Sequence, residues 1–174
     1  MSELLDDLLE AWEINNQINL YILRWIPPEG LEAVTLLKTG KPSRGRNVAR
    51  IFSHMHEVRC SKLERNLEDP GDLPRFEGSE VPDAARLRRA LDRSGTAVAK
   101  VVRDAVDGPG SLEGWKRSPV AWLMYLVSHD SHHRGQIAQA LKQSGVRPPQ
   151  EVSYGVWGYW GGYDLKEPWN EGTG

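Results

Sequence analysis

The sequence predicts an all-α protein, folded as a four-helix bundle with an aromatic C-terminal tail. Two observations favour this fold class. Four long segments repeat apolar residues at intervals of three and four, and the stretches between them hold the prolines and glycines that end helices. A chain of 174 residues is long enough for one domain with its own hydrophobic core. We therefore expect residues 1–145 to form the bundle and residues 146–174 to form a tail packed on it.

The first predicted helix runs from Ser2, a suitable N-cap, to about Trp25. Acidic side chains follow Ser2 in the first turn, and the Pro-Pro-Glu-Gly segment at residues 27–30 ends the helix. Residues 31–42 are expected to be a connector. The apolar stripe of this helix consists of Leu4, Leu5, Leu8, Leu9, Trp12, Ile18 and Ile22.

The second predicted helix starts at the cap residue Ser43 and reaches about Asn66. Prolines and glycines among acidic residues predict a loop at residues 68–81. The third predicted helix then runs from Asp83 to about Val106, with arginines on its polar side. The apolar positions of the two helices are Val48, Ile51, Met55 and Val58, and Leu87, Leu91, Val98, Val101 and Val102.

The fourth predicted helix begins at Ser118 and Pro119, a cap followed by a first-turn proline. It ends at Gly145, which suits the left-handed backbone at a helix C-terminus. Its core-facing stripe consists of Trp122, Leu126, His129, His133, Ile137 and Leu141. Because burying an unpartnered polar group costs on the order of a few kcal/mol, two histidines on this stripe must be hydrogen-bonded or bound to a metal.

Five histidines offer candidate metal ligands. His129 and His133 are four residues apart on a helix, so their imidazoles lie on one face, whereas His132 is about 100° away from His133. A third ligand must come from another helix. His54 lies near the inner face of the second helix, while His56 points away from it and is expected on the surface. Three imidazoles with a free fourth position are typical of a catalytic site, whereas four protein ligands are typical of a structural one.

The residues around these histidines leave several alternatives open. Asp130 turns the pair into a zincin-like HDxxH motif, but its short side chain argues against a peptidase base, so we expect a supporting or surface residue. Gln136 is expected near the metal face, where it can orient a ligand or contact substrate. Gly135 is expected to allow close helix packing, and Arg134 has either a packing or a functional role.

Composition excludes several classes of protein. Cys60 is the single cysteine, so no disulfide framework or cysteine-based metal knuckle is predicted, and we expect a buried side chain rather than a nucleophile. The N-terminus is acidic and no apolar run reaches the length of a membrane span, so we expect a soluble, cytoplasmic protein. With a net charge of −2 and interleaved basic and acidic residues, neither nucleic acid nor a membrane is an expected partner.

The C-terminal tail mixes aromatic residues with glycines. This composition argues against one regular helix across residues 146–174, yet the aromatic surface must dock on something. We expect the tail to wall an open metal site, with packing across helix ends or a dimer contact as the alternative. The six aromatic residues are Tyr154, Trp157, Tyr159, Trp160, Tyr163 and Trp169, and at least one of the first four is expected to line the metal pocket.

Residues 47–59 and the HDSHHRGQ segment at residues 129–136 resemble the histidine motifs of the DinB-like family, and residues 155–161 are similar to a C-terminal segment found in part of it. The resemblance implies an up-up-down-down four-helix bundle that binds one divalent ion, zinc or nickel, through His54, His129 and His133. It also implies a homodimer. Family members include thiol-dependent enzymes, among them relatives of maleylpyruvate isomerase and bacillithiol transferases.

Two hypotheses of function follow. The protein is a metal-dependent transferase or hydrolase that acts on a small organic substrate, with a low-molecular-weight thiol as a candidate cosubstrate. Alternatively, it is a non-catalytic, stress-associated binding or scaffold protein in which the metal only ties two helices together. An open fourth coordination position favours the enzyme, and a fourth protein ligand favours the scaffold.

Overall fold

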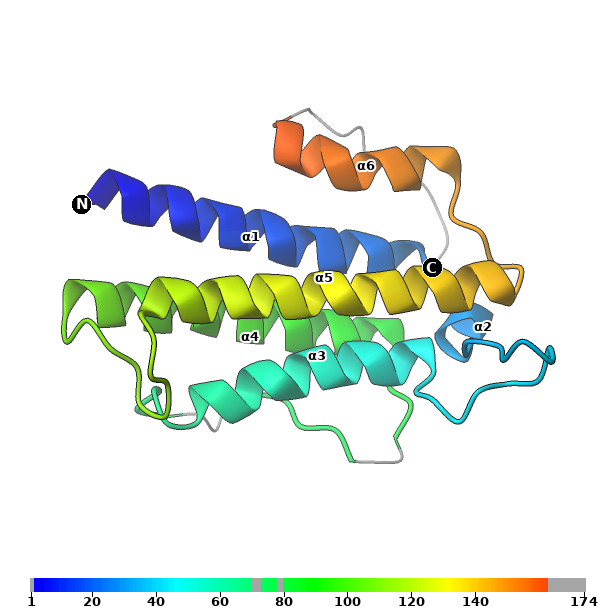
Figure 1. Ribbon diagram of the computed structural model, residues 1–174, viewed down its shortest axis with the longest axis horizontal. Helices are drawn as coiled ribbons and strands as arrows, with labels where there is room; N and C mark the ends of the chain where they lie inside the picture. Colours follow the sequence, from blue (N-terminus) through cyan, green and yellow to red (C-terminus); the bar gives the residue numbers. More distant parts are fainter. Residues whose placement is uncertain (1, 70–72, 78–79, 163–174) are drawn as a thin grey trace.

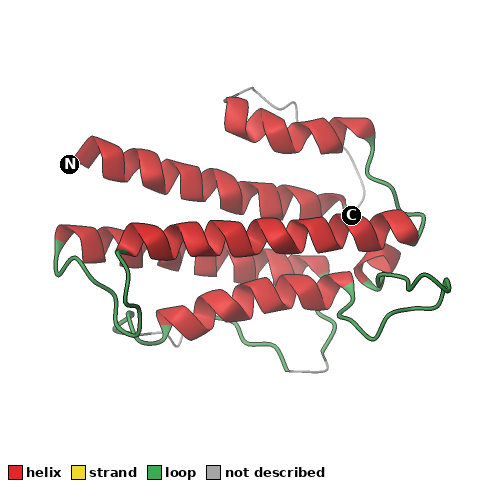
Figure 2. Ribbon diagram, in the orientation of Figure 1, coloured by secondary structure: helices red, strands yellow, loops and turns green. Residues whose placement is uncertain are grey.

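The computed structural model describes residues 2–69, 73–77 and 80–162. Within these residues the chain forms helices and turns, with one isolated antiparallel bridge between Leu36 and Pro42 and no strand (Figures 1 and 2). The predicted all-α class is confirmed. None of the described helices is both long and apolar enough to cross a membrane. The helices are α1 (Ser2–Trp25), α2 (Pro28–Leu31), α3 (Val48–Leu63), α4 (Ala84–Asp107), α5 (Pro119–Gln143) and α6 (Gln150–Gly161).

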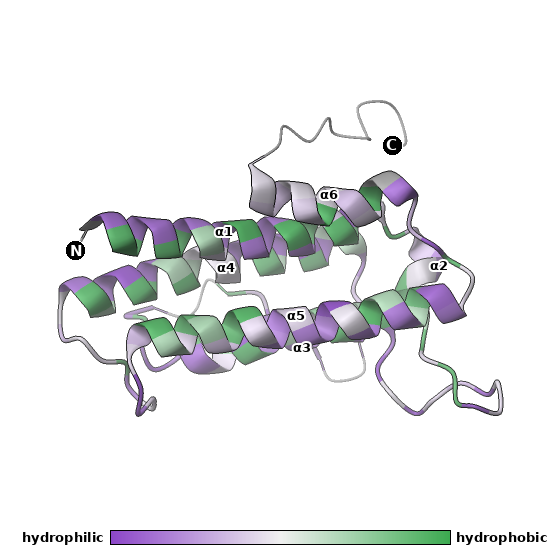
Figure 3. Ribbon diagram, turned by 45° about the horizontal axis from the view of Figure 1, so that its top comes forward, coloured by the Kyte–Doolittle hydropathy of each residue, from purple (hydrophilic) through white to green (hydrophobic). Residues whose placement is uncertain are grey.

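Helices α1, α3, α4 and α5 lie side by side (Figures 1 and 3). Trp12 Nε1 of α1 donates a hydrogen bond to the Gly95 carbonyl of α4 at 2.8 Å. Earlier on α1, Asp6 accepts a hydrogen bond from Arg103, which lies later on α4. These two contacts pair the beginning of one helix with the end of the other, so α1 and α4 are antiparallel.

The four long helices follow the order up-down-down-up. Figure 1 shows that α3 and α4 run opposite to α1, whereas α5 runs with it. The predicted up-up-down-down order is wrong. The connection between α1 and α3 turns back at α2, and the long crossover is the segment at residues 64–83, which brings the chain to the end where α3 began. Loop composition alone does not decide whether a long loop reverses the chain or crosses along the helices.

A polar layer divides the core. The buried apolar side chains form two clusters, one containing Trp12 and Leu126 and the other containing Phe52 and Ile137. Figure 3 shows the corresponding hydrophilic stretch midway along α5, between more hydrophobic ends. The buried polar residues of this layer are Asn15, Asn16, Asn19, His56, Arg59, Ser94, Asp130 and His133.

The predicted cap of α5 is confirmed, but that of α3 is not. The side chain of Ser118 accepts a backbone hydrogen bond at the start of α5, as expected, and Asp83, with which the third predicted helix began, caps α4. Helix α3 instead starts after Asn47, whose side chain accepts from the Arg50 amide at 3.0 Å. The predicted cap Ser43 is used elsewhere, because its hydroxyl accepts from the Gly45 amide within the preceding loop. The second helix is therefore shorter at both ends than predicted.

Part of the tail forms a regular helix that begins at Gln150, so residues 146–149 lie outside it and the tail is not one regular helix, as predicted. Helix α6 packs along α1 on the side away from α3 (Figure 1). The Tyr159 ring meets the Tyr21 ring edge-on, with centroids 5.5 Å apart. Gly155 permits this approach, because a Cβ there would lie 2.5 Å from the Tyr21 hydroxyl. The side chain of Ser2, and Tyr163 and Trp169, lie outside the described part of the structure.

Candidate metal centre

Three histidines from two helices meet between α3 and α5. His54 projects from α3, and His129 and His133 project from successive turns of α5. One ligand atom from each ring lies within 4.8 Å of the other two. The Nε2 atoms of His129 and His133 are 3.1 Å apart. The structure thus brings together the three residues expected from the sequence, and binding of a metal by them stays a prediction.

The donor set fits a divalent ion. Two nitrogens bound to one tetrahedral ion at about 2.0–2.1 Å would be roughly 3.4 Å apart, close to the separation of the His129 and His133 nitrogens. Burial, followed by the charge of Arg46, lowers the pKa of His54 to about 4. Burial also lowers the pKa of His133. Both rings are therefore neutral at pH 7, which is the form that binds metal.

The fourth coordination position has no protein candidate. Among the described residues, no cysteine, aspartate or glutamate joins the three histidines as a ligand group. Three neutral imidazoles leave the charge of a divalent ion uncompensated. The donor set therefore corresponds to the open type of site rather than the closed structural type.

Gln136 orients His133. The His133 Nδ1–H donates to Gln136 Oε1 at 2.8 Å, which directs the lone pair of Nε2 toward His129. The Gln136 amide nitrogen also contacts Nε2 of the exposed His132 at 3.0 Å. His132 stays outside the group of three, as expected. Gly135 does not serve close packing within the described chain, because a Cβ there would meet nothing within 4 Å.

Asp130 is fully buried on the other side of α5. Its Oδ2 accepts from Arg59 Nη2 at 2.6 Å and from the amides of Asn15 and Asn19, each at 2.9 Å. Burial raises its pKa, but the charge of Arg59 and these hydrogen bonds outweigh burial and hold the pKa at about 2. A carboxylate whose pKa is held this low is a poor general base, which argues against a peptidase.

The second oxygen of Asp130 faces the metal centre. Its Oδ1 lies 4.0 Å from Nδ1 of His129, and neither atom has a hydrogen-bond partner among the described residues. A carboxylate behind the distal nitrogen of a ligating imidazole holds that ring in orientation and favours the tautomer that exposes Nε2. Asp130 is thus a supporting residue of the site, and its alternative placement on the surface is excluded.

Arg134 belongs to the same buried network rather than to the metal face. Its Nη1 donates to Asn15 Oδ1 at 2.9 Å and to Asn19 Oδ1 at 2.8 Å. The contacts of Asn15, Asn19 and Arg59 with Asp130 were not predicted from the sequence. The available signal was the NNxxN pattern inside an apolar helical stripe, because asparagine is a poor helix former and must have a partner when buried.

A comparison with known families gives the family of this chain. The sequence model of the DinB family matches residues 1–157, which include α1 to α5 and much of α6. The chain belongs to the DinB family. No curated protein matches it. Family membership does not by itself assign a reaction to this chain.

His56 is buried, so its predicted surface position is wrong. Its side chain has no exposed area, and its Nε2 donates to the Pro74 carbonyl at 2.6 Å. The crossover loop covers this side of α3, which helical periodicity cannot foresee. Cys60 is buried beside it, and burial raises the pKa of the thiol to about 11. The predicted burial of Cys60 is confirmed.

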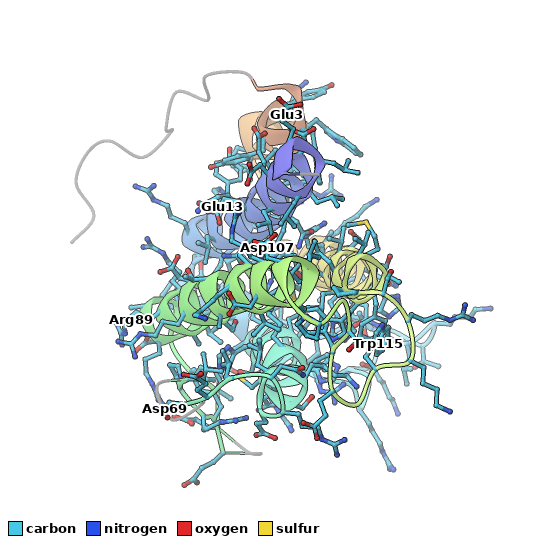
Figure 4. The ribbon with its side chains drawn as sticks, turned by 90° about the vertical axis from the view of Figure 1, so that its left-hand side faces the viewer. Glu3, Glu13, Asp69, Arg89, Asp107 and Trp115 are labelled. Carbon is cyan, nitrogen blue, oxygen red and sulfur yellow. The ribbon has the colours of Figure 1, made fainter. Side chains whose placement is uncertain are left out.

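The described part of the aromatic tail does not line the candidate metal centre. Helix α6 lies on α1, and α3 with His54 lies on the opposite side of the molecule (Figures 1 and 4). The expected wall residues either face solvent or pack on α1. Those facing solvent are Tyr154, Trp157 and Trp160, and the one packed on α1 is Tyr159.

The aromatic residues near the metal centre come from α5 and the loop before it. The Tyr125 ring centroid lies 6.0 Å from that of His129. Trp115 lies in the loop between α4 and α5 (Figure 4). Its ring centroid is 5.4 Å from that of Tyr125. Trp122, three residues before Tyr125, is buried in the core, as its place on the core-facing stripe predicts. Tyr125 and Trp115 therefore supply the flank that the tail was expected to provide.

Proposed function

We propose that this DinB-family protein is a metalloenzyme in which His54, His129 and His133 bind one divalent ion, zinc or nickel. The observation that carries the proposal is the convergence of three imidazole nitrogens from two helices within 4.8 Å. In this proposal, the four long helices form a four-helix bundle over residues 1–145, and residues 146–174 are an addition to it. A homodimer is the expected assembly.

The proposed reaction is a thiol-dependent transfer or a hydrolysis on a small organic substrate. A divalent ion with a free position polarises a substrate oxygen, or lowers the pKa of a bound thiol or water. Residues next to the three histidines orient the imidazole rings and limit access of solvent. Gln136 holds His133, Asp130 lies behind His129, and the Tyr125 ring limits access of solvent on one flank.

The scaffold alternative receives less support from the contacts. A metal that only ties α3 to α5 would be needed if those helices lacked other polar contacts. Arg59 of α3 already pairs with Asp130 of α5 inside the core, and this pair is joined to α1 by Asn15 and Asn19. The helices are thus held together independently of the three histidines.

Elemental analysis tests the proposed site. The protein is purified without chelators, and its zinc and nickel contents are measured per chain. We expect one ion per chain in the wild type, loss of the ion in His133→Ala, and retention in the matched neighbour His132→Ala. Full occupancy in His133→Ala would show that the ion is bound elsewhere. Assays of the loaded protein with low-molecular-weight thiols and electrophiles then test for transfer.

A further inference from the structure

We propose that the metal centre acts on a small organic acid whose carboxylate is bound by Arg46, in the cleft beside the three histidines. This inference rests on the proposed function, because the reacting end of the acid faces the metal ion. It adds the class of substrate and a residue that recognises it.

A cleft lies where the loop before α3 faces α5, next to the Gln136 side chain that hydrogen-bonds His133. Its volume is about 350 Å³, within the range of small-molecule sites. Arg46, Ser43 and Gln139 contribute polar groups to it, and Ile51 contributes apolar surface. Gln136 lines the same cleft and accepts the hydrogen bond from His133, so the cleft and the metal centre share a residue.

The loop that carries Arg46 is tied to the helices at both ends. The Leu36 amide donates to the Gln143 side chain of α5 at 2.6 Å, and Leu36 also bridges to Pro42. At its other end, Asn47 donates to the Glu32 carboxylate at 3.0 Å while capping α3. This loop therefore forms one wall of the cleft, opposite Gln136 and Gln139 of α5.

Arg46 places a positive charge next to a site for a divalent cation. Its side chain lines the cleft together with Gln136, which hydrogen-bonds His133. Within the described residues, Arg46 has no ion pair, unlike the exposed arginines Arg75 and Arg103, which pair with acidic side chains. An unpaired cation near a bound divalent ion is repelled by it unless an anion lies between the two charges.

An anionic ligand resolves this repulsion. The three imidazoles contribute no charge to the metal, and the planar guanidinium of arginine matches the geometry of a carboxylate. The cleft also presents the apolar side chains of Leu36, Leu37 and Ile51, which an inorganic anion would leave uncovered. These observations favour an organic acid over a free oxyanion.

Binding of two matched thiols to the cobalt-loaded protein tests the inference. The probes are 3-mercaptopropionate and 3-mercapto-1-propanol, which differ in the carboxylate, and binding is followed by thiolate-to-cobalt absorption. We expect the wild type to bind the acid roughly tenfold more tightly than the alcohol, the scale of one charge-assisted contact. In Arg46→Gln, affinity for the acid should fall to that for the alcohol, while affinity for the alcohol stays the same. Arg44→Gln, in the same loop, is the matched control and should keep the preference.

The outcomes separate this inference from the proposed function. A wild type that binds cobalt but shows no preference for the acid, or binds neither thiol, overturns the inference alone. The same conclusion follows if Arg46→Gln keeps the preference for the acid over the alcohol. A protein that binds no cobalt overturns the proposed function and the inference with it.

Discussion

Two sides of α5 use adjacent residues for different purposes. His129 and His133 face α3, and Asp130 and Arg134, each one residue further along, face α1. On the α1 side, Asp130 is fully buried and its Oδ2 accepts three hydrogen bonds. On the α3 side, imidazole nitrogens converge on one another, with His129 partly exposed and His133 buried. The comparison indicates that the hydrogen-bonded side holds the helix in place, which leaves the other side as the candidate for binding.

The geometry of the helix couples the two sides. Successive residues are about 100° apart, so any rotation of α5 that moves Asp130 also moves His129. The Arg59–Asp130 pair is completely buried, and replacing one partner of such a pair leaves the other charge unsatisfied. Changes on the α1 side are therefore expected to act on stability, and changes on the α3 side on metal affinity.

The largest expected effect is on stability, from Asp130→Ala. Loss of the carboxylate leaves the Arg59 guanidinium buried without a counter-charge, so the free energy of unfolding should fall by about 3–5 kcal/mol. Urea denaturation of the metal-free protein measures it. The control is Asp104→Ala, which breaks an exposed pair with Lys100 and should cost less than about 1 kcal/mol. Equal losses in the two variants would contradict the structural role of the buried network.

The next effect is on metal affinity, from Gln136→Ala. The His133 ring loses the acceptor that orients it, so affinity for zinc should fall about 10–100-fold while the free energy of unfolding changes little. Competition against a chromophoric chelator measures the affinity. Gln139→Ala, three residues along the same helix, should leave zinc affinity unchanged. If Gln136→Ala binds zinc as the wild type does, His133 is oriented without it.

A smaller effect is the pH dependence of the metal-free protein. The pKa of His54 is lowered from 6.5 to about 4 on folding, so the unfolded chain binds more protons between these values. Through His54, the free energy of unfolding is thus highest above pH 6.5 and decreases as the pH falls toward 4. Because His54 is only half-buried, we expect about 1 kcal/mol or less. Urea midpoints at pH 5 and 7 should differ less in His54→Gln than in the wild type, and an unchanged difference would refute this assignment.

The smallest expected effect comes from Trp157→Ala on α6. This helix lies on the α1 side of α5, where Val152 and Val156 line a small apolar pocket with Arg134. The Trp157 side chain is 70 % exposed, so its removal should change the free energy of unfolding by less than about 0.5 kcal/mol. Zinc and thiol affinities should stay within about twofold of the wild type. A tenfold loss of thiol affinity would indicate that the tail contributes to the metal centre.

The convergence of the three histidines could be predicted because it depends on the spacing of residues within each helix. His129 and His133 must share a face at a separation of four residues, and His54 follows from the apolar positions of its own helix. The burial of His56 could not be predicted in this way. The contact that buries it, with Pro74, comes from a crossover loop whose sequence carries no periodic signal.

The placement of the aromatic residues was beyond the sequence for a similar reason. An apolar surface on the tail is predicted by Tyr154, Trp157 and Trp160, but the partner of that surface is not. In the structure, α6 packs on α1 through Tyr159 and Gly155 and does not cover the candidate metal centre. An aromatic side chain contributes much the same free energy wherever it is buried, so composition alone does not choose its location.

The sequence by itself determined the helical class, the cap of α5 and the shared face of the paired histidines, because each depends on contacts within a few residues of the chain. Only the tertiary structure decided the directions of the helices, the polar layer and the cleft next to Arg46. These features depend on contacts between distant segments, such as Asn15 with Asp130, which are 115 residues apart. Helix geometry is local, whereas the choice of neighbour belongs to the packing of the whole chain.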